Sequence, residues 1–109
     1  MILLSKTAEA QLVSYMGDGN KVLILCTHPE GFKGCYGYIA GIADSMAGGN
    51  PVGGKRACIQ KEVTAGQLVD VTVNYLTQNP AERHVMGSHL VAAALAQAFP
   101  CRVPPSLSK

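Results

Sequence analysis

The sequence contains no tryptophan and few charged residues, and the shortage of charge restricts its function. Charged residues make up 15% of the chain, and nine basic residues against seven acidic ones give a net charge of +2. The basic residues are scattered. Nucleic-acid-binding domains instead gather them in a patch or stripe, often with aromatic residues between them. We therefore expect no nucleic-acid partner.

Long hydrophobic runs are also missing. A transmembrane helix needs about 20 consecutive apolar residues, and no run in the sequence approaches that length. A signal peptide needs an apolar stretch of roughly 7–15 residues and a small-x-small cleavage site. The apolar stretch 2–4 is too short, although Ala8-Glu9-Ala10 has the form of such a site. Two interpretations of residues 1–17 stay open: a truncated export signal, or a frayed N-terminal tail.

Four cysteines occur in the 109 residues, a length that suits one domain with one core. None of them forms a C-x-x-C pair, so the spacing typical of zinc sites is absent. An even number of cysteines in a short exported chain predicts disulfides, whereas a cytosolic location would favour free thiols. We expect no metal and no other cofactor.

Two helices are predicted in the first half of the chain. Residues 22–26 are apolar and are followed by Pro29, which favours a short helix capped by Asp18 or Asn20, with a strand as the alternative. A second helix is predicted over residues 32–47. Its apolar positions share one face: Cys35, Tyr38, Ile39, Ile42, Ala43 and Met46. Gly34, Gly37 and Gly41 form a second, smooth stripe, which predicts the close approach of another backbone within the fold or across a dimer.

Two more helices are predicted in the second half. Thr64 and Gln67 have the spacing of a capping box and begin the third, which ends near Asn79. Asn79 and Pro80 are expected to begin the fourth, with Glu82 in its first turn. The fourth helix ends at Pro100. The sequence thus predicts an all-α, four-helix domain over residues 18–102, with short links and a flexible tail over 103–109.

One long loop separates the second and third helices. Its sequence, GGNPVGGKRA, holds four glycines, and loops of this length in compact domains are often functional. We expect it to contact a protein partner by inserting into a cleft, and a mobile solvated loop is the alternative. The predicted contact residues are Gly48, Gly49, Asn50, Pro51, Lys55 and Arg56.

Several phrases of the sequence, in this order, resemble the Rap/Tai family of type VI secretion immunity proteins. The resemblance covers about residues 18–102. It rests on Cys26, on the stretch from Cys35 to Asp44 (CYGYIAGIAD), on Cys58 with the stretch 63–68 (VTAGQL), and on the stretch 80–84 (PAERH) followed by FPC at 99–101. The chain departs from the family at its N-terminus, where a full signal peptide is missing.

The resemblance implies an exported, all-helical protein that is not an enzyme. Such proteins reside in the periplasm, usually form homodimers, and bind a peptidoglycan amidase effector so that its active site is covered. They protect the producing cell. We therefore expect an immunity protein. The alternative functions are a periplasmic stress or chaperone-like binding protein and a small thiol enzyme, which would need an unpaired cysteine.

An up-and-down order of the helices predicts how the cysteines pair. The end of the first helix then meets the start of the second, and the start of the third lies beside the end of the fourth. This arrangement predicts the disulfides Cys26–Cys35 and Cys58–Cys101 among the three possible connectivities. Four free, buried thiols are the competing interpretation.

Overall fold

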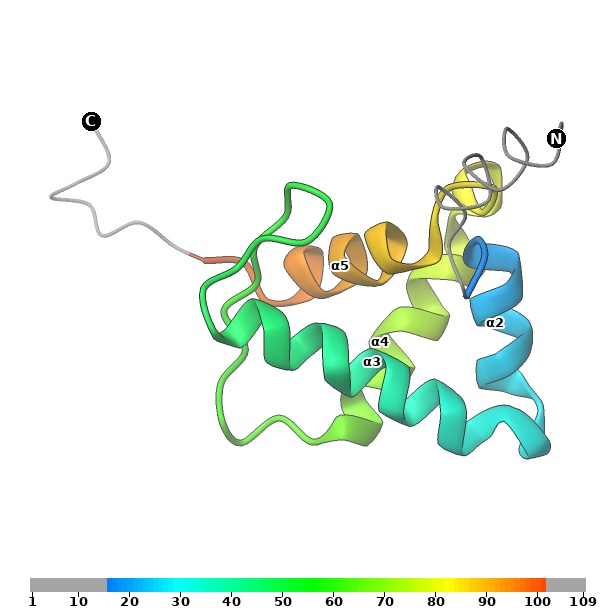
Figure 1. The fold of residues 1–109 in the computed structure, drawn as a ribbon, viewed down its shortest axis with the longest axis horizontal. Coiled ribbons are helices and arrows are strands. Elements are labelled where there is room, and N and C mark those ends of the chain that lie inside the picture. The colour runs from blue at the N-terminus through cyan, green and yellow to red at the C-terminus, as the bar shows by residue number, and fades with distance from the viewer. Residues whose placement is uncertain (1–15, 102–109) are drawn as a thin grey trace, which may run out of the picture.

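Four α-helices and two short 3₁₀ turns make up the computed structural model, which describes residues 16–101 (Figure 1). In chain order they are α2 (Gly19–Thr27), η1 (Pro29–Gly31), α3 (Phe32–Ala47), α4 (Ala65–Gln78), η2 (Pro80–Glu82) and α5 (Gly87–Ala98). Within this range there are isolated β-bridges and no strand. The predicted all-α, four-helix class is confirmed. The proposed export signal and the C-terminal tail lie outside the described residues, apart from the end of the former.

The first two helices form where the sequence predicts them. The Asp18 carboxylate accepts a hydrogen bond from the backbone N–H of Lys21 at 3.1 Å and so caps α2. The strand alternative for residues 22–26 is wrong. Helix α3 has the predicted bounds, and its apolar face buries Cys35, Ile39 and Met46.

The capping box of α4 is present. The Gln67 backbone N–H donates to the Thr64 hydroxyl at 3.1 Å, and the Thr64 backbone N–H donates to the Gln67 side chain at 2.7 Å. The one polar side chain among the buried residues described, Thr72, donates its hydroxyl to the Leu68 carbonyl at 2.9 Å. That bond removes the cost of an unpaired buried hydroxyl.

The predicted start of the fourth helix is wrong. Asn79 precedes the 3₁₀ turn η2 and Glu82 ends it, and α5 begins seven residues after Pro80, at Gly87. The reason is a tertiary contact with α2. The Arg83 and Val85 carbonyls accept hydrogen bonds from Asn20 and Gly19 at the start of α2, both at 3.1 Å. A continuous helix would have used those carbonyls within itself, so the contact with α2 interrupts it.

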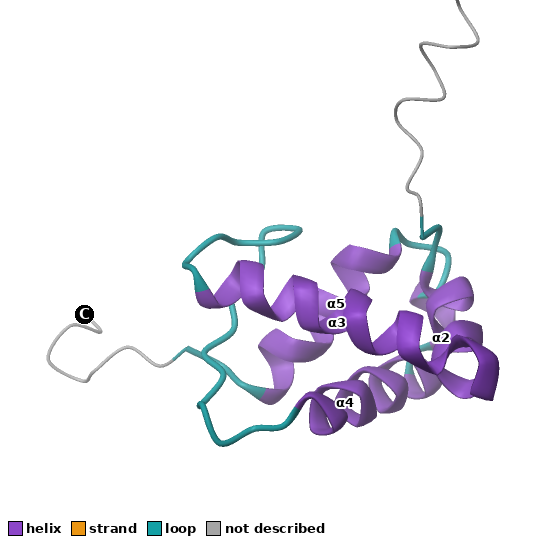
Figure 2. Cartoon of the chain, turned by 60° about the horizontal axis from the view of Figure 1, so that its bottom comes forward, coloured by secondary structure: helices purple, strands orange, loops and turns teal. Residues whose placement is uncertain are grey.

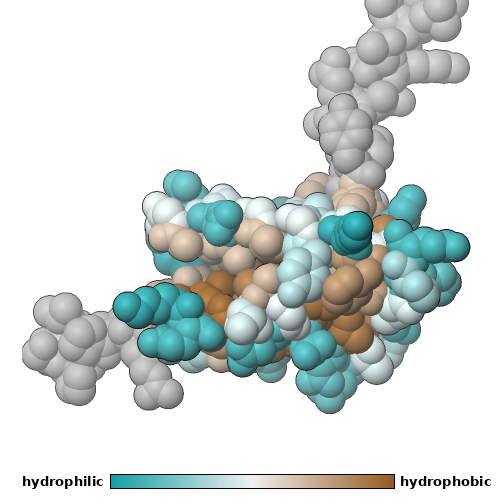
Figure 3. Space-filling view, turned by 90° about the horizontal axis from the view of Figure 1, so that it is seen from below, coloured by the Kyte–Doolittle hydropathy of each residue, from teal (hydrophilic) through white to brown (hydrophobic). Residues whose placement is uncertain are grey.

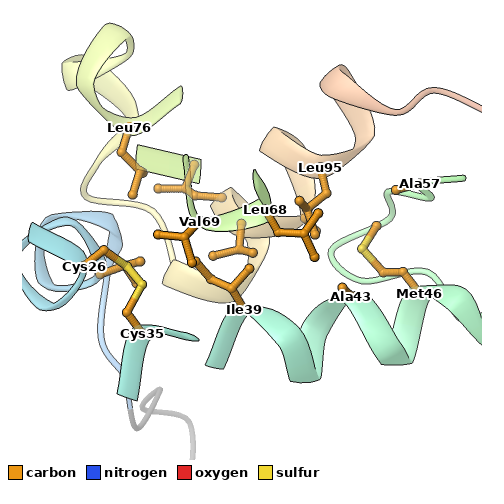
Figure 4. Close-up of a cluster of buried hydrophobic side chains, with 14 residues drawn as sticks. Cys26, Cys35, Ile39, Ala43, Met46, Ala57, Leu68, Val69, Leu76 and Leu95 are labelled. Atoms are coloured by element: carbon orange, nitrogen blue, oxygen red, sulfur yellow. A yellow bond between two sulfur atoms is a disulfide. The ribbon is translucent and has the colours of Figure 1, made fainter. Parts of the chain in front are cut away.

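One core lies between the four helices. Each helix contacts the other three, and Figure 4 shows their apolar side chains meeting around Ile39, Leu68 and Leu95. The largest fully buried side chains are Ile39, Leu76, Leu95, Val22, Val91, Thr72 and Cys35. Because every helix covers part of the same core, we expect the described chain to unfold as one cooperative unit.

The glycine stripe of α3 is not explained within the fold. A Cβ atom at Gly37 or Gly41 would have no neighbour within 4 Å, and at Gly34 it would meet only the Leu25 side chain. No backbone of the described chain approaches this face, so the predicted close approach within the fold is wrong. An approach by a second molecule stays a prediction.

The two ends of the domain differ in construction. Helix α2 occupies one end, and the long segment between α3 and α4 gathers at the other, beside the end of α5 (Figure 2). The described part of the chain contains no helix of the length and apolar character that a membrane span requires.

Candidate partner-binding surface

The predicted contact loop contains a tight hairpin. Val52 and Lys55 exchange backbone hydrogen bonds of 3.0 and 2.9 Å, with Gly53 and Gly54 between them at φ angles of +56° and +78°. Positive φ at both central residues defines a type I′ turn, which glycine adopts without strain. This part of the glycine-rich loop is therefore a defined turn.

The hairpin rests on α5. A Cβ atom added to Gly53 would lie 2.8 Å from two ring atoms of His89, so the turn is in close contact with that imidazole. The Arg56 guanidinium donates to the Gly49 carbonyl at 2.7 Å and closes the base of the loop. These contacts hold the loop in place and leave Lys55 and Arg56 exposed.

The predicted contact residues come together on this loop. Gly48, Gly49, Asn50, Pro51, Lys55 and Arg56 are all exposed. Their backbones are held by the turn that ends α3, where the Gly48 and Gly49 N–H groups donate to Asp44 and Met46 carbonyls at 3.1 and 3.0 Å. The loop thus presents two cations on a fixed frame.

A polar groove continues from the hairpin between α4 and α5. A hollow of about 390 Å³ is lined by Lys55, Tyr75, Asn79, Ala93, Ala96 and Gln97. A second hollow of about 350 Å³ shares Tyr75, Asn79 and Gln97 with it and extends along α4 past Asn74 and Gln78. We call the two together the α4–α5 groove. Its alanine side chains leave room for a bound chain, and its amides can donate and accept hydrogen bonds.

Hydrogen bonds fix one wall of the groove. The Asn79 side chain donates to the Tyr75 carbonyl at 2.9 Å, and the Tyr75 hydroxyl donates to the Glu82 carboxylate at 2.9 Å. Burial raises the pKa of the Tyr75 phenol, and Glu82 raises it further through the hydrogen bond and its charge. Tyr75 is therefore a protonated donor at neutral pH. Asn79, which precedes η2, and Glu82, which ends it, therefore also shape this wall.

Sequence reasoning missed the groove. Neither Tyr75 nor Gln97 is singled out by the sequence as a binding residue. The turn, in contrast, had a signal that could have been used: two adjacent glycines between Val52 and Lys55 are a typical type I′ turn sequence.

Both predicted disulfides are present. Cys26–Cys35 joins the end of α2 to the start of α3, and Cys58–Cys101 joins the segment after the hairpin to the residues that follow α5. The thiol-enzyme alternative requires an unpaired cysteine, and all four cysteines are paired.

Comparison with known families matches residues 18–101 to the Rap1a immunity proteins. The chain belongs to the Rap1a immunity protein family. Comparisons with curated proteins and with solved structures give no significant match. The Rap1a match spans all four helices and both disulfides, and membership of this family indicates an immunity function.

Proposed function

We propose that this protein neutralises a peptidoglycan amidase effector of type VI secretion by binding it, and that it is not itself an enzyme. The observation that carries the proposal is the Rap1a family match over the whole described fold. The amidase target and the secretion system come from the resemblance of the sequence phrases to the Rap/Tai family. Inhibition by binding needs only a complementary surface. A standard interface buries about 800 Å² on each partner.

We place the protein in the periplasm. Two disulfides in one small domain favour an oxidising compartment, because cytosolic reductants keep such thiols reduced. Peptidoglycan is also the substrate of the proposed target.

We assign effector binding to the hairpin and the α4–α5 groove. Lys55 and Arg56 supply positive charge on a frame fixed by the Val52–Lys55 and Arg56–Gly49 hydrogen bonds. The groove supplies amides that pair with an extended backbone. A rigid surface loses less conformational entropy on binding than a mobile loop does. Because the surface offers two cations and a polar groove, we expect the bound part of the effector to be a loop that carries acidic groups.

The test is co-expression of this protein with a peptidoglycan amidase effector of type VI secretion, both directed to the periplasm. The amidase alone should lyse the host, and co-expression should restore growth. Replacing both Lys55 and Arg56 by glutamate should weaken binding of the purified proteins by at least about tenfold, since reversing interface charges introduces repulsion. Calorimetry measures this loss.

Lys21→Glu is the matched control, because Lys21 is an exposed lysine on α2 at the far end of the domain. It should leave the affinity within about twofold. Lysis despite co-expression of the wild type would contradict the immunity proposal. Equal losses for the hairpin variant and the control would contradict the binding surface only.

We also propose that the protein forms a homodimer through α3. Lys33, Gly37, Gly41 and Asp44 are exposed and lie on one side of the helix by their spacing. Figure 1 shows α3 at the front of the molecule with no other element before it. In an antiparallel pair, Lys33 of each copy would face Asp44 of the other across a smooth surface at the glycines, which permits close helix packing.

Charge exchange tests this interface. Lys33→Asp should shift sedimentation toward the monomer, and Lys33→Asp combined with Asp44→Lys should restore the dimer, because the opposite charges are then paired again. Lys21→Asp should leave the assembly unchanged. A monomeric wild type at high micromolar concentration would contradict the dimer.

The chaperone-like alternative has less support. It predicts a broad exposed apolar surface. The exposed large hydrophobic residues among those described are Ile24, Phe32 and Met86. On the face seen in Figure 3, hydrophobic residues form patches separated by pale and hydrophilic ones.

A further inference from the structure

The two disulfides differ in their access to solvent. Cys26 is 6% exposed and Cys35 is fully buried, whereas Cys58 and Cys101 are both exposed. We propose that Cys58–Cys101 is a thiol–disulfide exchange site, which a dithiol reductant opens while Cys26–Cys35 stays closed in the folded protein.

An attacking thiolate can reach the exposed bond. Both Cys58 and Cys101 line a surface hollow of about 260 Å³ at the loop end of the domain. In contrast, Cys26 and Cys35 belong to the core cluster with Ile39, so a reductant reaches them only when the core opens (Figure 4). Exchange requires direct contact between the thiolate and a disulfide sulfur. The exposed bond therefore reacts from the native state.

Arg56 lines the same hollow, where its guanidinium is held by the Gly49 carbonyl at 2.7 Å. A nearby arginine lowers the pKa of a thiol because it stabilises the thiolate. Here it stabilises both the incoming thiolate and the protein thiolate that leaves. The cation therefore accelerates the exchange at this bond.

The exchange proceeds in two steps. The reductant thiolate attacks one sulfur of Cys58–Cys101, a mixed disulfide forms, and the other cysteine leaves as a thiolate that takes up a proton. The second thiol of the reductant loses its proton and attacks the mixed disulfide, which releases the first cysteine. The dithiol is oxidised to a disulfide, and the protein gains two thiols.

Opening this bond removes the covalent tie between the segment after the hairpin and the end of α5. The end of α5 lines the α4–α5 groove, and the segment with Cys58 directly follows the hairpin. Insofar as the proposed function holds, the reduced protein binds its effector more weakly. The exchange itself is independent of that function and is tested without the effector.

The test treats the native, oxidised protein with increasing dithiothreitol at neutral pH and labels new thiols with a maleimide. Peptide mass spectrometry then gives the rate at each cysteine. Labelling of Cys58 and Cys101 should be at least about tenfold faster than labelling of Cys26 and Cys35, as expected from the dependence of reactivity on exposure. Equal rates, or Cys26–Cys35 opening first, would overturn the proposal.

Arg56→Gln tests the role of the cation, with Lys55→Gln as the matched control. Both remove one charge from the hairpin, but only Arg56 lines the hollow. Arg56→Gln should slow the opening of Cys58–Cys101 by about threefold or more, Arg56→Lys should restore part of the rate, and Lys55→Gln should leave it nearly unchanged. A faster reaction in Arg56→Gln would show that Arg56 only shields the bond, and would overturn its assigned role.

Discussion

The α2 end and the loop end of this domain are held together by different means. At the α2 end, Gly19 lies against Leu76 and Leu90, and the disulfide Cys26–Cys35 is part of the core. At the loop end, an exposed disulfide holds the residues that follow α5 to the segment before α4, beside a backbone hydrogen bond of 2.8 Å from the Cys58 N–H to the Phe99 carbonyl. At the α2 end the disulfide is part of the packed core, whereas at the loop end an exposed covalent bond adds to the packing of Met46 and Ala57 and secures the surface that we assign to binding.

Such a division suits a binding protein. Helix packing alone needs apolar area, and a surface of glycine, lysine and asparagine has little to bury. A disulfide restricts the unfolded chain and therefore stabilises a polar loop without apolar contacts. The loop end can then vary its surface residues to fit a partner while the core stays unchanged.

Removing the exposed disulfide should have the largest effect on stability. The bond spans 43 residues, so Cys58→Ala with Cys101→Ala should lower the free energy of unfolding by about 4 kcal/mol according to the chain-entropy relation. Urea unfolding followed by circular dichroism measures the loss. Because the core is unchanged, the helix content before unfolding should match the wild type. A loss below about 1 kcal/mol would mean that packing, not the covalent bond, holds the loop end.

Adding one methyl group at the α2 end should have the next largest effect. A Cβ atom at Gly19 would overlap the Leu90 side chain and lie 3.1 Å from both the Arg83 carbonyl oxygen and the Leu76 side chain. Overpacking of this kind costs about 1–3 kcal/mol, and we expect Gly19→Ala to fall at the upper part of that range. Thermal and urea unfolding both report it.

Gly41→Ala is the matched control for Gly19→Ala. A Cβ atom there meets nothing within 4 Å, so in protein diluted to the monomer, away from the proposed α3 dimer contact, the better helix propensity of alanine should stabilise the fold by about 0.5–1 kcal/mol. The same substitution would thus have opposite signs at the two sites. A loss at both would show that the α2 end is no more tightly packed than the outer face of α3.

Periodicity, capping residues and prolines were sufficient to predict most of the fold. The bounds of α3 follow from its apolar spacing and from Pro29 shortly before it. The start of α4 follows from the capping residues Thr64 and Gln67. The pairing of the cysteines follows from the order of the helices. These features depend on residues close together in the sequence or on the order of the helices. Both can be determined from a single sequence.

Contacts between distant segments could not be predicted in the same way. The start of α5 depends on Gly19 and Asn20, more than 60 residues earlier, which use the Arg83 and Val85 carbonyls. The α4–α5 groove depends on how two helices pack, so Tyr75 and Gln97 become neighbours only in the fold. The hairpin was within reach of the sequence, because the Gly53-Gly54 pair is a local signal.

The smallest of these effects concerns a non-covalent anchor at the loop end. Thr64→Ala removes the hydroxyl that accepts from the Gln67 backbone N–H at 3.1 Å at the start of α4. Loss of such a cap costs about 1 kcal/mol, and urea unfolding should show it. Thr77→Ala, on the exposed side of the last turn of α4, controls for the loss of a threonine. If Thr64→Ala approaches the cost of removing Cys58–Cys101, the cap and not the disulfide is the principal support of the loop end.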